Sequence, residues 1–356
     1  MSLEIKLRHS FPGFSLDVEF QAPASGVTAL FGPSGAGKST IMSSIAGLLH
    51  ADYERIVLNG ITLADRDVHL PAERRRIGIV FQDGRLFPHL NVAANLRYGL
   101  RRAPAGPVMF DDVVDLLGIE SLLGRLPRDL SGGERGRVAI GRALLSQPQL
   151  VLMDEPLVSL DRARRLDILP YLARLKSRLD VPILYVTHEL EEVVRLADTL
   201  VLLEAGHIIA TGPTGPVLAR ADLPLAHRDD TAAILQGTVV RHDVARRLTS
   251  VEAAGRTILL SQCDAGVGTP IRLRIPAREV AIATQAPQAI SFQNCISAKV
   301  GALVEENTAH AVVIELILDG ATLLARITPD AVERLALHPG ATVLALFKAT
   351  SVEPVA

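Results

Sequence analysis

The stretch GPSGAGKST, residues 32–40, constrains the fold more than any other feature of the chain. It follows the apolar run VTALF and precedes the helical segment STIMSSIAGLL. Its spacing, G-x-x-x-x-G-K-[ST], is typical of a loop whose backbone N–H groups turn towards phosphate at a helix N-terminus. A plain glycine-rich turn is the alternative, and the strand–loop–helix context argues against it. The sequence therefore predicts an α/β domain that binds a nucleotide.

Two side chains of this loop have specific chemical tasks. Lys38 is expected to reach the β- and γ-phosphates, and the Ser39 hydroxyl is expected to bind Mg²⁺. The other loop residues are expected to line the nucleotide; they are Gly32, Pro33, Ser34, Gly35, Ala36, Gly37 and Thr40. The predicted cofactors are ATP and Mg²⁺.

Polar residues that follow short apolar runs supply the rest of a hydrolytic site. The run LVLMDEP ends in Asp154, placed to organise Mg²⁺, and Glu155, placed to polarise the attacking water. His188 ends ILYVTH and is expected to contact the γ-phosphate, while Gln82 ends IGIVFQ and is expected to sense Mg²⁺ and water. Adjacent carboxylates at a strand end are often only solvated, but the phosphate loop upstream favours a catalytic pair.

A second phosphate-binding pattern lies far from the first. The stretch DLSGGERGR, residues 129–137, places Ser131, Gly132 and Gly133 at the start of a predicted helix. Helix N-termini that begin with small residues suit anions. One chain thus carries two phosphate loops about 90 residues apart in sequence, and the residues alone do not explain why.

The ordered motifs GPSGAGKST, Gln82, LSGGE, LVLMDEP, SLD and His188 resemble those of the ATP-binding-cassette ATPases over roughly residues 1–227. The resemblance implies a head-to-tail homodimer in which Ser131, Gly132 and Gly133 hold the nucleotide bound by the partner. It also implies that Asp161 crosses the dimer seam. Glu134 stands where the family usually has Gln, which adds a negative charge near the nucleotide.

The family also places an aromatic ring under adenine. Phe14 and Phe11 are both candidates for this contact, and either ring suits the core equally well. We take Phe14 as the adenine contact and leave Phe11 open.

Residues 71–100 more closely resemble the ATP-binding subunit of bacterial molybdate importers. In such subunits the segment RLFPHLNV docks a coupling helix of a membrane permease, which is fed by an extracytoplasmic substrate-binding protein. The resemblance therefore implies docking roles for Arg85, Phe87, Pro88 and His89; ordinary loop packing is the alternative. The loop HADYER, after Leu49, departs from the family because it lacks Pro and Gly.

Short alternating strands replace the α/β pattern after about residue 227 and predict two small all-β barrel modules. The last module resembles oligonucleotide/oligosaccharide-binding-like, molybdate-binding barrels. That resemblance implies Ser291, Thr328 and Lys348 as oxyanion ligands. Gln293 stands where the pattern has Arg, so a neutral amide replaces a charged fork. A barrel that only dimerises is the alternative.

The composition excludes some classes of protein. With 37 basic and 39 acidic residues, the chain lacks the excess positive charge that binding to a nucleic acid backbone requires. It shows no secretory leader and no apolar run long enough to cross a membrane. Two cysteines far apart, Cys263 and Cys295, fit a reduced compartment. A mean hydropathy of +0.28 fits either apolar partner surface or an Ala- and Leu-rich core.

The sequence thus predicts a P-loop nucleotide-binding cassette with a helical subdomain in residues 1–228, followed by barrels in residues 229–288 and 289–356. The predicted activity is ATP hydrolysis that drives import of molybdate or tungstate, by a subunit peripheral to the cytoplasmic face of the bacterial inner membrane. Alternatives are the same engine for sulfate or ferric iron, a soluble cassette ATPase, and a molybdate sensor without transport.

Overall fold

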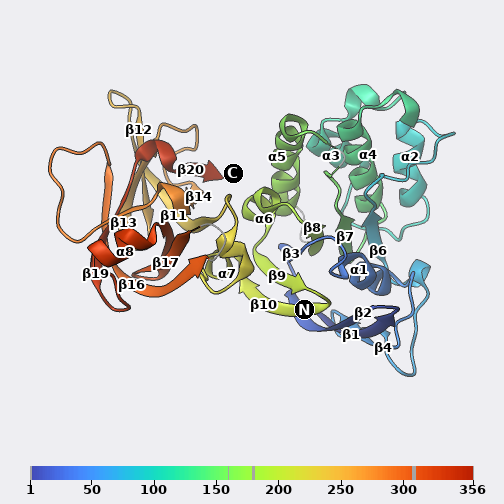
Figure 1. The fold of residues 1–356 in the computed structure, drawn as a ribbon. Coiled ribbons are helices and arrows are strands. Elements are labelled where there is room, and N and C mark those ends of the chain that lie inside the picture. Colours follow the sequence, from blue (N-terminus) through green and yellow to red (C-terminus); the bar gives the residue numbers. More distant parts are fainter. Residues whose placement is uncertain (1, 159, 179–180, 307–309, 356) are drawn as a thin grey trace. The chain divides into compact units, whose positions relative to one another are not determined.

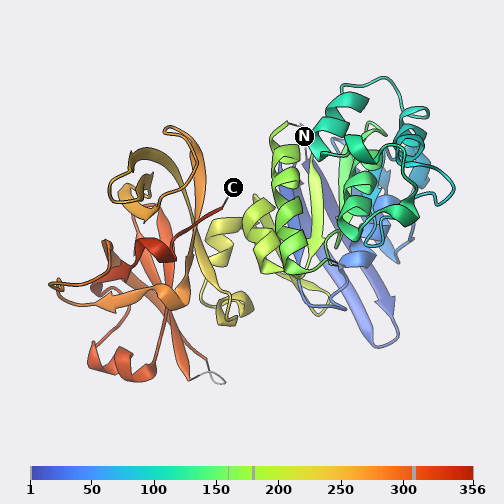
Figure 2. The same ribbon diagram turned by 90° about the horizontal axis from the view of Figure 1, so that it is seen from above.

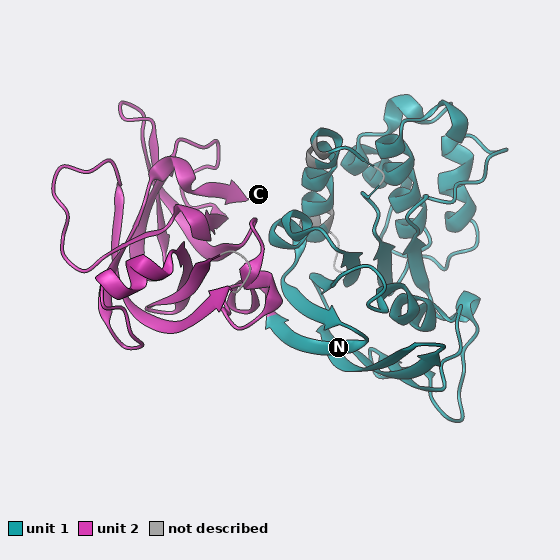
Figure 3. Cartoon of the chain, in the orientation of Figure 1, with its two compact units in different colours: residues 1–212 teal, residues 213–356 magenta. Residues whose placement is uncertain are grey.

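The computed structural model describes residues 2–158, 160–178, 181–306 and 310–355. The chain forms two compact units, residues 1–212 and residues 213–356 (Figure 3). The first unit mixes helices with a large sheet, and the second is mainly β. The predicted order of an α/β cassette followed by all-β modules is confirmed.

A ten-stranded sheet forms the centre of the first unit, in the order β5-β4-β1-β2-β10-β9-β3-β8-β7-β6. Strands β9, β3, β8, β7 and β6 pair in parallel, whereas β1, β2, β4 and β5 pair antiparallel. The strand bounds are β1 Ser2–Phe11, β2 Phe14–Pro23, β3 Val27–Phe31, β4 Tyr53–Leu58, β5 Ile61–Ala64, β6 Ile77–Val80, β7 Leu150–Asp154, β8 Ile183–Thr187, β9 Thr199–Glu204 and β10 His207–Pro213.

Helices cover both faces of the parallel strands. Their bounds are α1 Lys38–Ala46, α2 Val92–Leu100, α3 Phe110–Leu117, α4 Gly132–Leu144, α5 Arg162–Arg178 and α6 Leu190–Leu196, with short 3₁₀ turns at Ala72–Arg74 (η1), Glu120–Leu122 (η2) and Pro127–Asp129 (η3). Figures 1 and 2 show α2, α3 and α4 gathered as one group of helices. This group corresponds to the helical subdomain expected from the sequence.

The first four residues of strand β7, residues 150–153, are all apolar because both faces of the strand are covered. Leu150 and Leu152 belong to the core that contains α1, whereas Val151 and Met153 belong to the core that contains α3 and α4. Successive side chains of a strand point to opposite faces, so a strand covered on both faces needs apolar residues at every position. The polar side chains that follow the strand therefore appear abruptly at its carboxyl end.

The second unit contains two antiparallel five-stranded sheets, in the orders β13-β12-β11-β14-β20 and β15-β19-β16-β17-β18. Their bounds are β11 Ala232–Asp243, β12 Leu248–Ala253, β13 Arg256–Ser261, β14 Pro270–Pro276, β15 Ala281–Ala283, β16 Asn294–Glu306, β17 Ala311–Leu318, β18 Ala321–Ile327, β19 Thr342–Phe347 and β20 Glu353–Val355. Helices α7 (Thr214–Leu218) and α8 (Pro329–Arg334) and the turns η4 (Pro224–His227), η5 (Ala277–Glu279) and η6 (Ala349–Ser351) complete the unit.

The two sheets exchange strands. Strand β15 comes from the first set but pairs with β19, and β20 comes from the second set but pairs with β14. Buried residues from both sets form one cluster, and the fully enclosed amide of Asn294 bonds the backbone N–H and C=O of Leu259 at 2.8 and 2.9 Å. The two sheets therefore share a single core.

The connection between cassette and sheets packs with the second unit. Ala221 and Ala226 cluster with Val313 and Leu324. The domain boundaries expected at residues 228 and 288 stay predictions.

Candidate functional site

The phosphate loop runs from the end of β3 to the start of α1. A Cβ at Gly32 would lie 2.2 Å from the carbonyl oxygen of Leu203, so no side chain fits there. Gly37 caps α1 with a φ of 100°, a left-handed conformation that favours glycine. The loop is therefore shaped by backbone approaches that only glycine permits.

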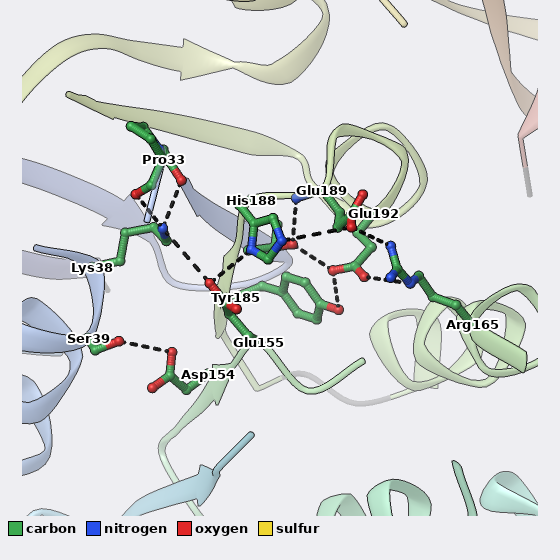
Figure 4. Close-up of polar contacts among 12 residues, drawn as sticks. Pro33, Lys38, Ser39, Asp154, Glu155, Arg165, Tyr185, His188, Glu189 and Glu192 are labelled. Atoms are coloured by element: carbon green, nitrogen blue, oxygen red, sulfur yellow. Dashed lines mark hydrogen bonds and ion pairs between the residues drawn. The ribbon is translucent and has the colours of Figure 1, made fainter. Parts of the chain in front are cut away.

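Lys38 lies inside this loop. Its Nζ donates to the carbonyl oxygens of Gly32 and Pro33 at 2.7 and 2.9 Å, and it lies 3.9 Å from Glu155 Oε1 (Figure 4). Burial lowers the pKa of Lys38, while the charges of Glu155 and Asp154 oppose this shift. The ammonium group is thus held at the centre of the loop, between backbone carbonyls and two carboxylates.

Ser39 and Asp154 meet across the loop. The Ser39 hydroxyl donates to Asp154 Oδ1 over 3.4 Å. Burial raises the pKa of Asp154, and the neighbouring Glu155 carboxylate raises it further, against the smaller effects of Ser39, Lys38 and Arg85. The Ser39 hydroxyl and the partly desolvated Asp154 carboxylate are hard oxygen donors. Such donors suit a divalent cation such as Mg²⁺.

Glu155 directly follows β7 and adopts a φ of 43°, which is uncommon for a residue with a side chain. Its Oε1 lies 3.0 Å from His188 Nδ1, beyond the end of β8. The structure therefore brings Lys38, Glu155 and His188 together, as Figure 4 shows.

A buried polar cluster behind His188 was not found from the sequence. Glu192 accepts from the Tyr185 hydroxyl at 2.9 Å and from Thr187 Oγ1 at 2.7 Å, and burial raises its pKa. Arg165, on α5, pairs with Glu189 at 2.8 Å and with Glu192 at 3.6 Å. Arg165 and Glu192 lie on different helices, so only the fold shows that they meet.

A pocket of about 330 Å³ opens over the phosphate loop. Its lining comprises Phe11, Phe14, Ser34, Gly35, Gly37, Lys38, Ser39, Thr40, Gln82, Asp154 and Glu155. Ala36 lies instead in the core beneath α1. Both candidate aromatics face the pocket, with ring centroids 6.3 Å apart, so the choice between Phe14 and Phe11 stays open.

Ser131 and Gly133 do not line that pocket, although Gly132 lines a neighbouring one of about 540 Å³ that also contains Gln82 and Asp154. Ser131 is the N-cap of α4: its Oγ accepts from Glu134 N at 3.3 Å, and its own N–H donates to the Glu134 carboxylate at 2.7 Å. This hydrogen bond is the main cause of the lowered pKa of Glu134. Glu134 thus closes a capping box, which a Gln at this position also forms.

Asp161 is exposed and accepts from the N–H of Arg164 at 3.0 Å. It does not line either pocket. Ser159, the first residue of the SLD motif, lies outside the described residues. Ser131, Gly133 and Asp161 therefore do not line the phosphate-loop pocket of their own chain.

The predicted docking segment has an anchored part and an exposed part. The fully buried Asn95 accepts from Phe87 N at 2.8 Å and donates to the carbonyl oxygens of Phe87 and Leu90. Arg142, on α4, donates to the carbonyls of Gly84 and Arg85. The side chains of Arg85, Pro88 and His89 are exposed. The fold therefore holds the backbone of this segment while those three side chains face outward.

The three oxyanion candidates, Ser291, Thr328 and Lys348, are exposed. Ser291 and Lys348 flank paired ends of β16 and β19, where Asn294 lies opposite Phe347. Thr328 follows β18, whose last residue Ile327 pairs with Val312 of β17. The Gln293 side chain accepts from Ala349 N at 2.9 Å and so occupies the amide beside Lys348.

Residues 16–158 match the ABC transporter family, and residues 290–354 match the TOBE domain. The molybdenum import ATP-binding protein ModC of Granulibacter bethesdensis is 46% identical, over 99% of this chain and 98% of its own length. The solved structure of cbiO1 from Clostridium perfringens, part of an ABC transporter complex, is 25% identical with a TM-score of 0.53; the match covers 62% of this chain and 91% of that one. A solved ADP conformation of an ABC transporter cassette is 28% identical with a TM-score of 0.50, over 60% of this chain and 91% of that one.

The phosphate loop, its facing carboxylates and these matches define an ABC-type ATPase, a fold that binds ATP or ADP. The chain belongs to the family of molybdenum import ATP-binding proteins. Within the described ranges of the chain, no helix has the length and apolar character needed to cross a membrane.

Proposed function

We propose that the chain is the ATPase subunit of a molybdate importer and that it hydrolyses Mg-ATP as a head-to-tail homodimer. The observation that carries the proposal is the assembly of Lys38, Asp154 and Glu155 at one pocket, with His188 bonded to Glu155. The chain is related over 99% of its length to a molybdenum import ATP-binding protein. Tungstate, a similar oxyanion, fits the same proposal.

Lys38 binds the nucleotide phosphates in this mechanism. Its Nζ already points into the loop, where two carbonyl oxygens hold it, so it is positioned before the nucleotide arrives. The N–H groups of the loop and the N-terminus of α1 add positive potential at the same place. Ser39, Asp154 and Gln82 would hold Mg²⁺, which neutralises charge that develops on the phosphates.

Glu155 acts as the general base for the attacking water. Its carboxylate lies at the edge of the pocket, and the hydrogen bond to His188 fixes its orientation. His188 also lies 3.8 Å from Glu189, which Arg165 holds. His188 therefore orients the base, and its imidazole ring can also contact the γ-phosphate.

The homodimer completes each site. Ser131, Gly132 and Gly133 lie at the N-terminus of α4, where the first-turn N–H groups favour an anion. In a head-to-tail pair these groups contact the γ-phosphate bound by the partner, and Asp161 lies at the seam. Because both subunits contact one nucleotide, ATP stabilises the closed dimer, and hydrolysis removes that stabilisation.

The importer requires two further components. The exposed Arg85, Pro88 and His89 form the contact with a membrane permease, so the subunit is peripheral to the cytoplasmic face of the membrane. An extracytoplasmic binding protein delivers the oxyanion to the permease and does not contact this chain.

Glu155→Gln tests the proposal directly. The variant keeps ATP binding but slows steady-state hydrolysis by roughly 10²–10⁴-fold, the range for loss of a positioned base. In vesicles that contain the permease, molybdate uptake falls in parallel. The matched control is Glu204→Gln, which changes an exposed carboxylate at the end of β9 and leaves both rates unchanged. Hydrolysis by Glu155→Gln near the wild-type rate contradicts the assigned base.

A further inference from the structure

A cluster of two histidines and a carboxylate lies outside the ATP site, in the loop region that departs from the family pattern. His50 follows α1, Glu54 lies on β4, and His69 lies between β5 and η1. One ligand atom from each residue lies within 4.8 Å of the other two. Nothing in ATP hydrolysis requires this cluster.

Glu54 is the centre of the cluster. Its side chain is only 7% exposed, and its Oε1 lies 2.9 Å from His69 Nδ1 and 3.7 Å from His50 Nδ1. Its Oε2 is buried and has no hydrogen-bond partner among the described residues. An enclosed carboxylate oxygen without a donor is costly, so such an atom points to a missing ligand.

Arg75 offers a purely structural explanation for the cluster, because its charge interacts with that of Glu54, but it donates no hydrogen bond to the buried Glu54 Oε2. Arg75 is buried and donates to the carbonyl oxygens of Leu70, Ser44 and Ile45. Its Nη2 lies 3.2 Å from Nε2 and 3.5 Å from Nδ1 of His69. An atom almost equidistant from both ring nitrogens lies over the ring face and not along either lone pair. His69 therefore keeps its ligating nitrogen on the side of Glu54.

We propose that His50, Glu54 and His69 bind a divalent transition-metal ion of the zinc class. Two imidazoles and one carboxylate form a common three-residue set for zinc, with water in the fourth position. Ligands about 2.0–2.1 Å from a tetrahedral ion lie roughly 3.3 Å from one another. The two distances from Glu54 Oε1, 2.9 and 3.7 Å, lie on either side of that value.

The side chain of His50 completes the site by rotation. Its ring stacks on His69 with centroids 3.4 Å apart, which is closer than two rings on one tetrahedral ion can lie. Because the His50 side chain is 72% exposed, its ring can rotate away from His69 towards solvent. The ion would therefore separate the stacked rings while Glu54 and His69 remain in place.

The position of the site gives it a physical connection to the phosphate loop. Helix α1 begins at Lys38, and the carbonyls of Ser44 and Ile45 near its other end accept from Arg75. Arg75 lies against His69, so metal binding acts on groups that hold the end of α1. The positive charge of Arg75 also weakens the binding of a cation, and the carboxylate of Glu54 and the carbonyls at the end of α1 offset that charge.

Titration with Co²⁺ alone tests the site. The full chain, without an affinity tag or nucleotide and carrying Cys263→Ser and Cys295→Ser, is expected to bind one Co²⁺ with visible absorption typical of a tetrahedral ion, and Zn²⁺ displaces it. His50→Ala and Glu54→Gln each weaken binding by about tenfold or more. Since His50 is exposed, its variant keeps the fold, which an unchanged melting temperature in EDTA verifies.

His9→Ala is the matched control. His9 Nδ1 lies 3.3 Å from Asp52 Oδ1, so it forms a similar histidine–carboxylate pair without a third ligand. This variant keeps wild-type Co²⁺ binding. The proposal is overturned if the chain binds no Co²⁺, or if binding survives both His50→Ala and Glu54→Gln. The cluster then only packs against Arg75.

Discussion

Asp154 and Glu155 lie next to each other at the end of β7, and placing both charges there lowers the free energy of unfolding. Burial and the Glu155 charge raise the pKa of Asp154 above its value in an unfolded chain. A raised folded-state pKa favours folding at low pH, and this contribution is lost as the pH rises through the folded-state value. At neutral pH the ionised Asp154 therefore destabilises the nucleotide-free protein.

Asp154→Asn is expected to raise the melting temperature of the nucleotide-free chain near neutral pH. The difference shrinks towards about pH 4, where the carboxyl group gains its proton in both states. Calorimetry across this pH range measures it. Asp319→Asn, at an exposed residue, is the control and shows no such pH-dependent gain. Equal melting temperatures for wild type and Asp154→Asn at neutral pH contradict the argument.

Lys348 and Gln293 decide whether the C-terminal barrel binds an oxyanion. We expect molybdate to raise the melting temperature of the full chain, and Lys348→Ala to abolish this shift because it removes the positive charge. Gln293→Ala enlarges the shift, since it frees the Ala349 N–H for the anion. Sulfate and the variant Lys299→Ala are the controls. No shift at millimolar molybdate leaves the barrel with a role in dimerisation only.

At the scale of single elements, the docking segment between β6 and α2 combines two functions that mutation can separate. Arg85 is exposed and lies with its guanidinium 4.0 Å from the centre of the Phe81 ring. Phe87 instead packs against Tyr98 with ring centroids 4.3 Å apart, and the guanidinium of Arg142 lies 5.1 Å from the centre of the Phe87 ring. We expect the exposed His89 to contact the permease, whereas Phe87 lies between α2 and α4.

His89→Glu, at an exposed residue that lines neither pocket, is therefore expected to abolish molybdate uptake in vesicles while the isolated subunit keeps its ATPase rate. Phe87→Ala lowers both, because it opens a gap between two helices of the subunit. Uptake and ATPase assays on the same preparations distinguish the two. A fall in the basal ATPase of His89→Glu as large as the fall in uptake assigns His89 to the fold and not to the permease.

Regular elements near the phosphate loop were predictable, whereas contacts between distant residues were not. Apolar runs such as VTALF and QLVLMDE indicated buried parallel strands, and the structure confirms them. The contact of Arg165 with Glu192 and the grouping of His50 with His69 depend on how elements pack. The periodicity of a sequence gives the face of an element but does not identify its partner.

For the molecule as a whole, the separation of the Ser131 loop from the phosphate-loop pocket predicts complementation between subunits. Lys38→Ala and Ser131→Arg each inactivate both sites of their own homodimer. In a mixed dimer one composite site carries both changes and the other carries neither, so ATPase activity returns on mixing. Mixing two differently tagged Lys38→Ala preparations is the control. No recovery in verified mixed dimers contradicts composite sites.

The exchange of β15 and β20 between the two sheets affects how the chain folds while it is being synthesised. Strand β14 pairs with β20, which follows it by about eighty residues, so the first sheet keeps an open edge until the second set of strands has left the ribosome. The cassette precedes both sheets and needs neither strand for its own core. A nascent chain halted between residues 283 and 353 would thus carry a folded ATPase and an unpaired strand edge, which is a natural target for chaperones.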